Sequence, residues 1–462
     1  MSIYAWNQIE WQLIEFRISR LQNRIYKAML RNNLKTVHFL QRKLTSSVDG
    51  KLLSVREVTT HNRFNDTNEL YKYKLYLAKS LELDVSTSFE KEFLKQKKKS
   101  ERLKMTLIKD QAKQYLVKLA LEPQWKALLK AGSSNFDYEK RSKDIIEEIY
   151  NKIQNKSVST LTTILSFERL NPVLFTQKIN TIRSIAKQVE VWLQRGLLNN
   201  SIQESEEFFK SSCKHEEKII FPLLASITLH GLEIYLRKWS INLEISSKNY
   251  ETYTRMQIIK YKNNFLIASL WSELIEKSPL VLNHWLSMLG LKLHQERTSI
   301  KKVAEGFDFL GFHIILITWQ KYYRLKIHVS KNAKVIFLQT IRETLKKSKA
   351  VSTYKLIQKL KPILIKWANY YVHCECSKDF RQIDHVICDQ LKRWVFRRKA
   401  SGKNKFKLKE LYFPTNKIWV YKKIVHKNNW VLASREDKED KPNIYLPKLS
   451  WIKSFHSFSK VN

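Results

Sequence analysis

Residues 356–413 read LIQKLKPILIKWANYYVHCECSKDFRQIDHVICDQLKRWVFRRKASGKNKFKLKELYF. Within this stretch Trp367, Tyr370 and Tyr371 recur at helical spacing, and further along basic residues alternate with aromatic ones around Trp394. Basic side chains neutralise phosphates and aromatic faces stack on unpaired bases, so the pattern favours a helical nucleic-acid surface. The alternative is an amphipathic helix whose aromatics lie in the core and whose basic face is only solvated. The candidate binding residues are Lys361, Lys366, Trp367, Tyr370, Tyr371, Lys392, Arg393, Arg397, Arg398 and Lys399.

The amino-acid sequence of this stretch also resembles that of a known family. Its segments K-P-I-L-I-K-W-A-N-Y-Y (361–371), F-R-Q-I-D-H-V-I (380–387) and L-K-R-W-V-F-R-R (391–398) follow one another as in the maturase domain of group II intron-encoded proteins. That domain is also called the X or thumb domain. The resemblance implies an RNA-binding helical domain, and it implies that a reverse transcriptase precedes this domain in the chain.

The composition indicates a polyanionic partner. The 462 residues include 84 Lys and Arg against 43 Asp and Glu, which gives a formal net charge of +41. This excess favours nucleic acid over a membrane surface, and no apolar run reaches the roughly 18 residues of a membrane-spanning helix. Cys374, Cys376 and Cys388 lie near His373 and His385, but their spacing fits no standard zinc finger. We therefore expect no metal site, no cofactor and no small-molecule substrate.

Residues 7–44 are predicted to be helical. An apolar stripe that includes Ile14, Ile18 and Ile25 lies about a quarter of a turn from a basic stripe, so one face can pack while the other meets phosphate. The alternative is an ordinary surface helix with solvated arginines. R-L-Q-N-R-I-Y-K-A (20–28) resembles the N-terminal region of group II intron reverse transcriptases, which in that family grips intron RNA. The basic stripe consists of Arg17, Arg20, Arg24, Lys27 and Arg31.

The same resemblance identifies the positions that carry polymerase chemistry in the family. A polymerase palm uses carboxylates to hold two divalent ions about 4 Å apart. The corresponding positions here are Thr162, the turn at residues 261–264 and, in place of the nucleotide loop, residues 215–218. Amides bind Mg²⁺ weakly and a lysine repels it, so we predict that polymerase activity is lost and that no catalytic residue remains. The degenerate positions are Thr162, Glu216, Glu217, Lys262, Asn263 and Asn264.

The resemblance implies an α+β fold. We expect helix-rich fingers and a palm with a small antiparallel sheet, followed by a helical maturase thumb. Pro123 is expected to end or kink a helix, and Gly306 and Gly311 are expected to permit turns that side chains would block. The expected divisions are a basic helical RNA-binding region at 1–62, a shortened finger segment at 63–107, a degenerate palm at 108–318, the thumb at 319–415, and a basic, aromatic tail without an endonuclease module at 416–462.

The function that these features imply is RNA binding in an organelle. In the resembled family the intron RNA is the catalyst and the protein stabilises its folded form, so we expect a splicing factor of the maturase type. Residues with A/T-rich codons are favoured, and the N-terminus, with Glu10 and Glu15, does not read as a transit peptide. We therefore expect synthesis inside a plastid, with the mitochondrion as second choice. The sequence predicts no oligomeric state.

Other functions stay open at this point. The main alternative is a general RNA-binding or ribosome-associated organellar protein derived from a maturase, such as the relative associated with the plastid ribosomal operon. An active reverse transcriptase is disfavoured by the replaced carboxylates. A purely structural ribosomal protein is disfavoured because the resemblance to a polymerase extends over so much of the chain.

Overall fold

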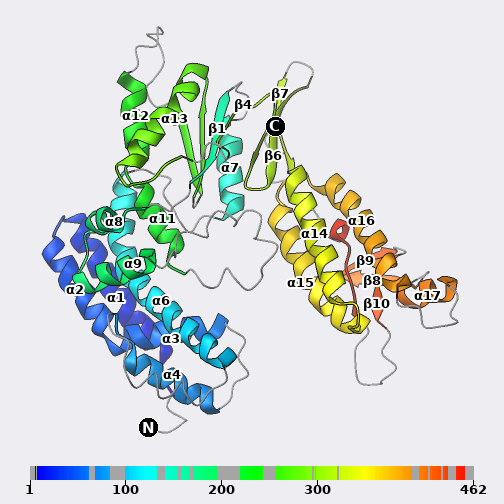
Figure 1. Ribbon diagram of the computed structural model, residues 1–462, viewed down its shortest axis with the longest axis horizontal. Coiled ribbons are helices and arrows are strands. Elements are labelled where there is room, and N and C mark those ends of the chain that lie inside the picture. Colours follow the sequence, from blue (N-terminus) through cyan, green and yellow to red (C-terminus); the bar gives the residue numbers. More distant parts are fainter. Residues whose placement is uncertain are drawn as a thin grey trace.

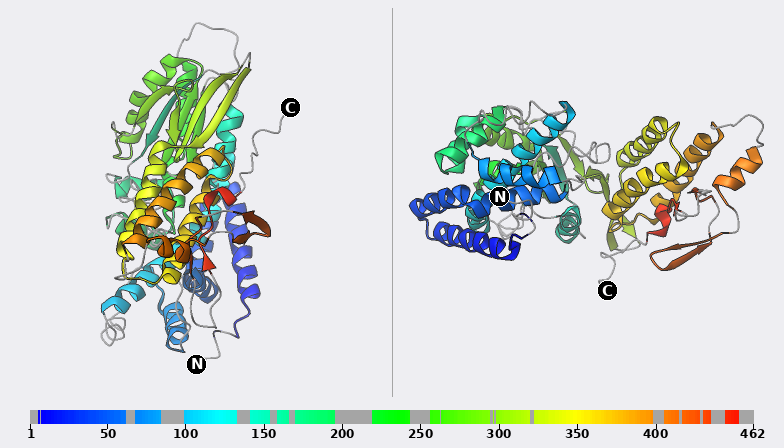
Figure 2. Two further views of the ribbon diagram at one scale, coloured as in Figure 1. Left: turned by 90° about the vertical axis from the view of Figure 1, so that its right-hand side faces the viewer. Right: turned by 90° about the horizontal axis from the view of Figure 1, so that it is seen from below.

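The computed structural model describes residues 6, 8–61, 68–83, 99–132, 141–153, 158–165, 170–194, 219–242, 256–261, 263–293, 296, 298–319, 322–397, 405–414, 417–427, 430–434 and 444–452. These residues form two lobes that lie side by side along the longest axis of the molecule (Figure 1). The view from below shows the same two lobes joined by extended chain (Figure 2). Two hydrophobic cores are present, and the second extends from α7 (Ser142–Ile153) and one face of the first β-sheet into the C-terminal lobe. Among the described residues, no helix combines the length and the apolar character needed to cross a bilayer.

The N-terminal helices pack around one long helix. They are α1 (Trp11–Leu30), α2 (Leu34–Ser46), α3 (Val48–His61), α4 (Asn68–Ser80) and α6 (Lys99–Gly132). Helices α1, α2 and α3 all contact α6. The predicted apolar stripe of α1 is confirmed, because Ile14, Ile18 and Ile25 are buried in this core.

The single helix predicted for residues 7–44 is wrong, since the chain breaks between α1 and α2. Asn32 adopts a left-handed backbone conformation with φ 53°, which asparagine tolerates better than most residues. The side chain of Asn33 then accepts a hydrogen bond of 3.1 Å from the amide of Thr36 and caps the new helix. The two helices can therefore lie side by side.

Of the two outcomes expected at Pro123, an end or a kink of its helix, the first is wrong, because α6 continues to Gly132. A proline removes the hydrogen bond that its amide would donate to the carbonyl four residues earlier, here that of Leu119. The side-chain amide of Gln22 on α1 donates to this carbonyl at 2.9 Å instead. The bond offsets the cost of an unpaired buried carbonyl, so the helix continues and α1 is tied to it.

A four-stranded antiparallel sheet forms the palm. Its strands are β1 (Ser159–Ile164), β2 (Gln257–Tyr261), β3 (Asn264–Ser269) and β4 (Ser299–Lys302), in the order β2-β3-β1-β4. One face, with Phe265 and Ile267, belongs to the first core, while Leu266 belongs to the second. The remaining palm helices are α7 (Ser142–Ile153), α8 (Pro172–Ile179), α9 (Arg183–Gln194), α11 (Phe221–Leu229), α12 (Leu232–Asn242) and α13 (Ser272–Ser287).

A three-stranded sheet leads from the palm into the thumb. It consists of β5 (Phe307–Phe309), β6 (Phe312–Trp319) and β7 (Tyr322–Val329). Gly306 and Gly311 have φ values of 82° and 79°, which confirms that both turns need glycine. The thumb itself contains α14 (Lys331–Lys347), α15 (Thr353–Tyr371), α16 (Ser377–Phe396) and α17 (Lys405–Tyr412). The predicted α+β fold with small antiparallel sheets and a helical thumb is confirmed.

The thumb is locked onto this sheet at the β5–β6 turn. The hydroxyl of Tyr370 donates to the carbonyl of Leu310 at 3.0 Å, and its ring stacks on Phe312 with centroids 5.5 Å apart. The hydroxyl of Tyr371 lies so close to Gly311 that a β-carbon there would collide with it. We call this contact of α15 with the β5–β6 turn the hinge lock.

The described residues 417–427, 430–434 and 444–452 pack onto the thumb helices. Their elements are β8 (Ile418–Tyr421), β9 (Ile424–Lys427), β10 (Ala433–Ser434), β11 (Ile444–Tyr445) and the short 3-10 helix η6 (Leu449–Trp451). The amides of Leu449 and Ser450 donate to the carboxylate of Asp384 on α16 at 2.8 and 2.9 Å. Trp419 and Trp451 are buried in the same core as the thumb helices. This part of the expected tail is thus joined to the thumb.

Candidate nucleic-acid interface

The basic stripe of α1 faces solvent as predicted. All five of its members are exposed, on the side of the helix away from Ile18 and Ile25. Arg17 makes an ion pair of 3.5 Å with Asp49 on α3, which is worth little at an exposed site. The stripe consists of Arg17, Arg20, Arg24, Lys27 and Arg31.

Helix α2 extends this basic surface, which the sequence reasoning missed. Lys35, Arg42 and Lys43 are exposed, and the segment LKTVHFLQRKLTS contains no acidic residue. The absence of acids on a helix with three cations was the available signal. Helices α1 and α2 lie against each other in the first lobe (Figure 1), so the exposed cations of both helices stand on adjoining helices. We call these exposed faces of the two helices the α1–α2 surface.

The thumb aromatics belong to the core, so the prediction that they stack on RNA bases is wrong. Trp367 is 0% exposed and Tyr371 is 1% exposed. The Trp367 ring stacks on Phe337 of α14 with centroids 4.2 Å apart. Tyr370 is committed to the hinge lock, and burial raises the pKa of its hydroxyl. The alternative reading of this stretch, with aromatics inside and cations outside, describes the structure.

The thumb cations divide into two groups. Lys366, Arg393 and Arg397 are exposed, and the last two lie one turn apart at the end of α16. Lys392 is half-buried, with an ion pair of 3.3 Å to Asp389 and its ammonium 4.0 Å from the Trp430 ring centroid. Lys361 is half-buried, with its ammonium 5.9 Å from the Tyr445 ring centroid. Arg398 and Lys399 lie outside the described residues.

The palm positions that carry carboxylates in the resembled family are brought together here. Thr162 on β1 and Asn264 on β3 line one cleft of about 290 Å³ between the sheet and the start of α14. Asn263 is buried, and its side-chain amide donates to the carbonyl of Leu165 at 3.3 Å. Asn263 thus closes the β2–β3 turn onto the end of β1. Lys262, Glu216 and Glu217 lie outside the described residues.

Replacing Asn263 with aspartate is expected to destabilise the protein by about 1–3 kcal/mol, because a carboxylate oxygen would face the Leu165 carbonyl in place of the amide that donates to it. Asn264→Asp is the matched control, since its side chain is only half-buried and its amide donates to the Asn263 side chain at 3.3 Å. Urea unfolding at neutral pH measures both. A stable Asn263→Asp protein that extends primers with Mg²⁺ would contradict this structural role and the predicted loss of polymerase activity.

Two other lysines near the sheet make polar contacts within the protein. Lys260 on β2 lies 3.7 Å from the Glu233 carboxylate, and burial lowers its pKa to about 8. The ammonium of Lys178 donates to the carbonyl of Thr228 at 2.7 Å, and burial lowers its pKa to about 8 as well. Buried cations with internal partners are poor contacts for RNA, so neither belongs to the candidate interface.

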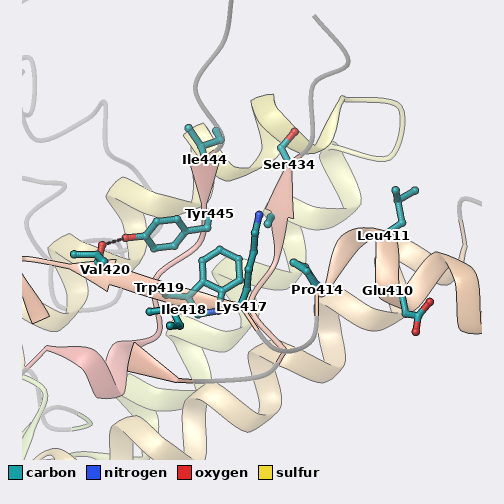
Figure 3. A pocket seen from close by; sticks show the side chains of 11 residues that line it. Glu410, Leu411, Pro414, Lys417, Ile418, Trp419, Val420, Ser434, Ile444 and Tyr445 are labelled. Carbon is teal, nitrogen blue, oxygen red and sulfur yellow. Dashed lines mark hydrogen bonds between the residues drawn. The ribbon is translucent and has the colours of Figure 1, made fainter. Parts of the chain in front are cut away.

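A larger cleft of about 460 Å³ lies between α17, β8 and the β10–β11 pair (Figure 3). Tyr445 donates a hydrogen bond to the carbonyl of Val420, and its ring centroid is 5.1 Å from that of Trp419. Lys417 reaches over Trp419, with its ammonium 5.9 Å from the ring centroid. The Trp419 side chain is only 5% exposed, so this cleft offers little aromatic surface to a base.

Comparisons with known proteins match both ends of the chain. Residues 6–80 match the family described as the N-terminal domain of reverse transcriptase, and residues 335–413 match the maturase-specific domain of group II introns. Maturase-like protein 1 of Euglena longa is 25% identical over 434 residues, which cover 87% of this chain and 84% of the relative. The sequence resemblance to group II intron maturases is therefore confirmed.

A solved structure of telomerase from Candida albicans, in complex with a fragment of telomeric RNA, is also similar. It shares 12% sequence identity with a TM-score of 0.31, and the match covers 67% of this chain. The match spans 59% of the telomerase chain. A likeness this slight says nothing about function.

Proposed function

We propose that this chain is an RNA-binding protein derived from a group II intron maturase, and that it stabilises the folded form of an intron RNA in an organelle. The observation that carries the proposal is the α1–α2 surface, whose eight exposed cations lie within the segment matching the N-terminal domain of reverse transcriptase. The maturase-specific match over the thumb supports the same partner. A protein that binds the active RNA fold better than its competitors stabilises that fold by its differential affinity.

The proposed function does not include polymerase chemistry. Thr162 and Asn264 offer hydroxyl and amide oxygens to their cleft, and Asn263 is committed to Leu165. Two carboxylates, those of Glu296 and Asp308, also line the cleft, but they stand outside the family's catalytic positions and Asp308 is paired with His313 at 2.6 Å. Mg²⁺ in polymerase sites is held by carboxylates, and neutral oxygens alone bind it weakly. This supports a role in which the palm serves as a scaffold between two RNA-binding ends.

The triple variant Arg20→Ala, Arg24→Ala and Lys27→Ala tests RNA binding at the α1–α2 surface. With three fewer phosphate contacts, we expect weaker binding and a plot of log affinity against log salt that is about 2 units shallower. Fluorescence anisotropy with labelled RNA over a salt series measures both quantities. The matched control removes the exposed palm lysines Lys238, Lys277 and Lys292, which changes the net charge equally. Equal losses of RNA affinity in both variants would refute the proposal that RNA binds specifically at the α1–α2 surface.

Crosslinking to organelle RNA with sequencing of the bound fragments tests the identity of the target. Reads concentrated on one or a few introns, and lost in the triple variant, are the expected result. Reads spread over ribosomal RNA or ribosomal-protein transcripts, with introns at background, would overturn the splicing role and leave a general RNA-binding protein.

A further inference from the structure

Two large aromatic side chains on the α1–α2 surface are turned into solvent. Phe16 on α1 is 64% exposed and Phe39 on α2 is 61% exposed. The thumb aromatics Trp367 and Tyr371, by contrast, are almost completely buried. A single exposed apolar side chain is common on protein surfaces, so it is the charges around each ring that are informative.

Phe39 is surrounded by positive charge. On a helix, residues three and four positions apart are neighbours, so Lys35, Arg42 and Lys43 flank its ring. All three are exposed on the side of α2 opposite its buried residues. The ring therefore projects between cations that can hold successive phosphates.

Phe16 on α1 has fewer cationic neighbours than Phe39 has on α2. Arg20 lies one turn further along the same exposed face. The nearby acid, Glu15, is engaged by Arg56 of α3 in an ion pair of 2.6 Å. This pairing neutralises Glu15 and leaves the face around Phe16 positive. A positive face favours a polyanionic partner over an apolar one or over a protein with few acidic residues.

We propose that Phe16 and Phe39 stack on unpaired nucleobases of single-stranded RNA while the neighbouring cations bind its phosphates. This rests on the proposed function, because it assigns the strand type to the same surface. Aromatic faces stack on any base, whereas bases inside a duplex are covered by their neighbours. The α1–α2 surface is thus assigned to a loop, a bulge or another unpaired segment.

The experiment compares a labelled single-stranded RNA oligonucleotide with the same strand in a duplex, by anisotropy at fixed salt. Phe39→Ala and Phe16→Ala are each expected to lower affinity for the single strand about tenfold and to leave duplex affinity unchanged. Phe39→Tyr keeps a ring and is expected to bind like the unaltered protein, whereas Phe39→Leu keeps only apolar surface and is expected to behave like alanine. The matched control is Leu280→Ala, because Leu280 is 76% exposed on α13 in the palm.

The outcomes separate this inference from the proposed function. If the Arg20, Arg24 and Lys27 variant loses RNA affinity while the phenylalanine variants do not, RNA binding stands and base stacking is overturned. If Phe39→Leu binds as well as Phe39→Tyr, or duplex affinity falls equally, base stacking is also overturned. If the unaltered protein binds neither RNA and instead binds an acidic peptide offered as a competitor, both proposals fail. Thermal unfolding of each variant confirms that the exposed substitutions leave the fold intact.

Discussion

Replacing Gly311 with alanine is expected to destabilise the protein by about 2–4 kcal/mol, a sum of two effects. A residue with a β-carbon is strained at the φ of 79° found here, at a cost of roughly 1 kcal/mol. The new β-carbon would also meet the hydroxyl of Tyr371, and overpacking of this kind typically costs about 1–3 kcal/mol. The hinge lock would have to open or shift.

Gly231→Ala separates the two effects. Gly231 has a similar φ of 89°, but a β-carbon there would meet nothing within 4 Å. Its substitution should therefore cost only the backbone strain. Tyr371→Phe in the Gly311→Ala background removes the colliding oxygen and should recover part of the lost stability. Urea unfolding of the four proteins measures this, and equal losses at Gly311 and Gly231 would show that no collision occurs.

Trp367→Ala is expected to cost about 3–5 kcal/mol of unfolding free energy, because it empties a fully buried site between α14 and α16. The ring stacks on Phe337 and has its centroid 5.6 Å from that of Phe380. RNA affinity per folded molecule should not change, since the ring has no exposed surface.

Val335→Ala is the control for this substitution, as Val335 is 61% exposed on α14 and its loss should hardly change stability. Chemical denaturation and anisotropy on the same samples give both quantities. A stable Trp367→Ala protein with reduced RNA affinity would restore the stacking role that the sequence pattern suggested.

The sequence correctly predicted features that depend only on residues close to one another along the chain. The two stripes of α1 follow from helical periodicity, and the glycine turns at 306 and 311 follow from the scarcity of glycine elsewhere. The thumb aromatics were misassigned because an aromatic stripe has the same spacing whether it faces a core or a ligand. Neighbouring helices decide between the two, and here Phe337 covers Trp367.

Long-range contacts could not be predicted. Pro123 is accommodated by Gln22, which lies 97 positions before the freed carbonyl of Leu119. No local sequence pattern predicts that hydrogen bond. The exposure of Phe39 likewise depends on which side of α2 meets α1 and α6, although the cations around it were visible in the sequence.

The hinge lock also bears on the distance between the two basic ends of the molecule. The α1–α2 surface and the exposed end of α16 lie in different lobes, toward opposite ends of the longest axis (Figure 1). Tyr370 and Phe312 hold α15 against the β5–β6 turn, which restricts how far the thumb helices can shift relative to this sheet. An RNA that presents two sites at the spacing of the two ends meets the second end at a high effective concentration, whereas a short hairpin can use only one. Under the proposed function, such a protein would bind large RNA folds more tightly than short hairpins.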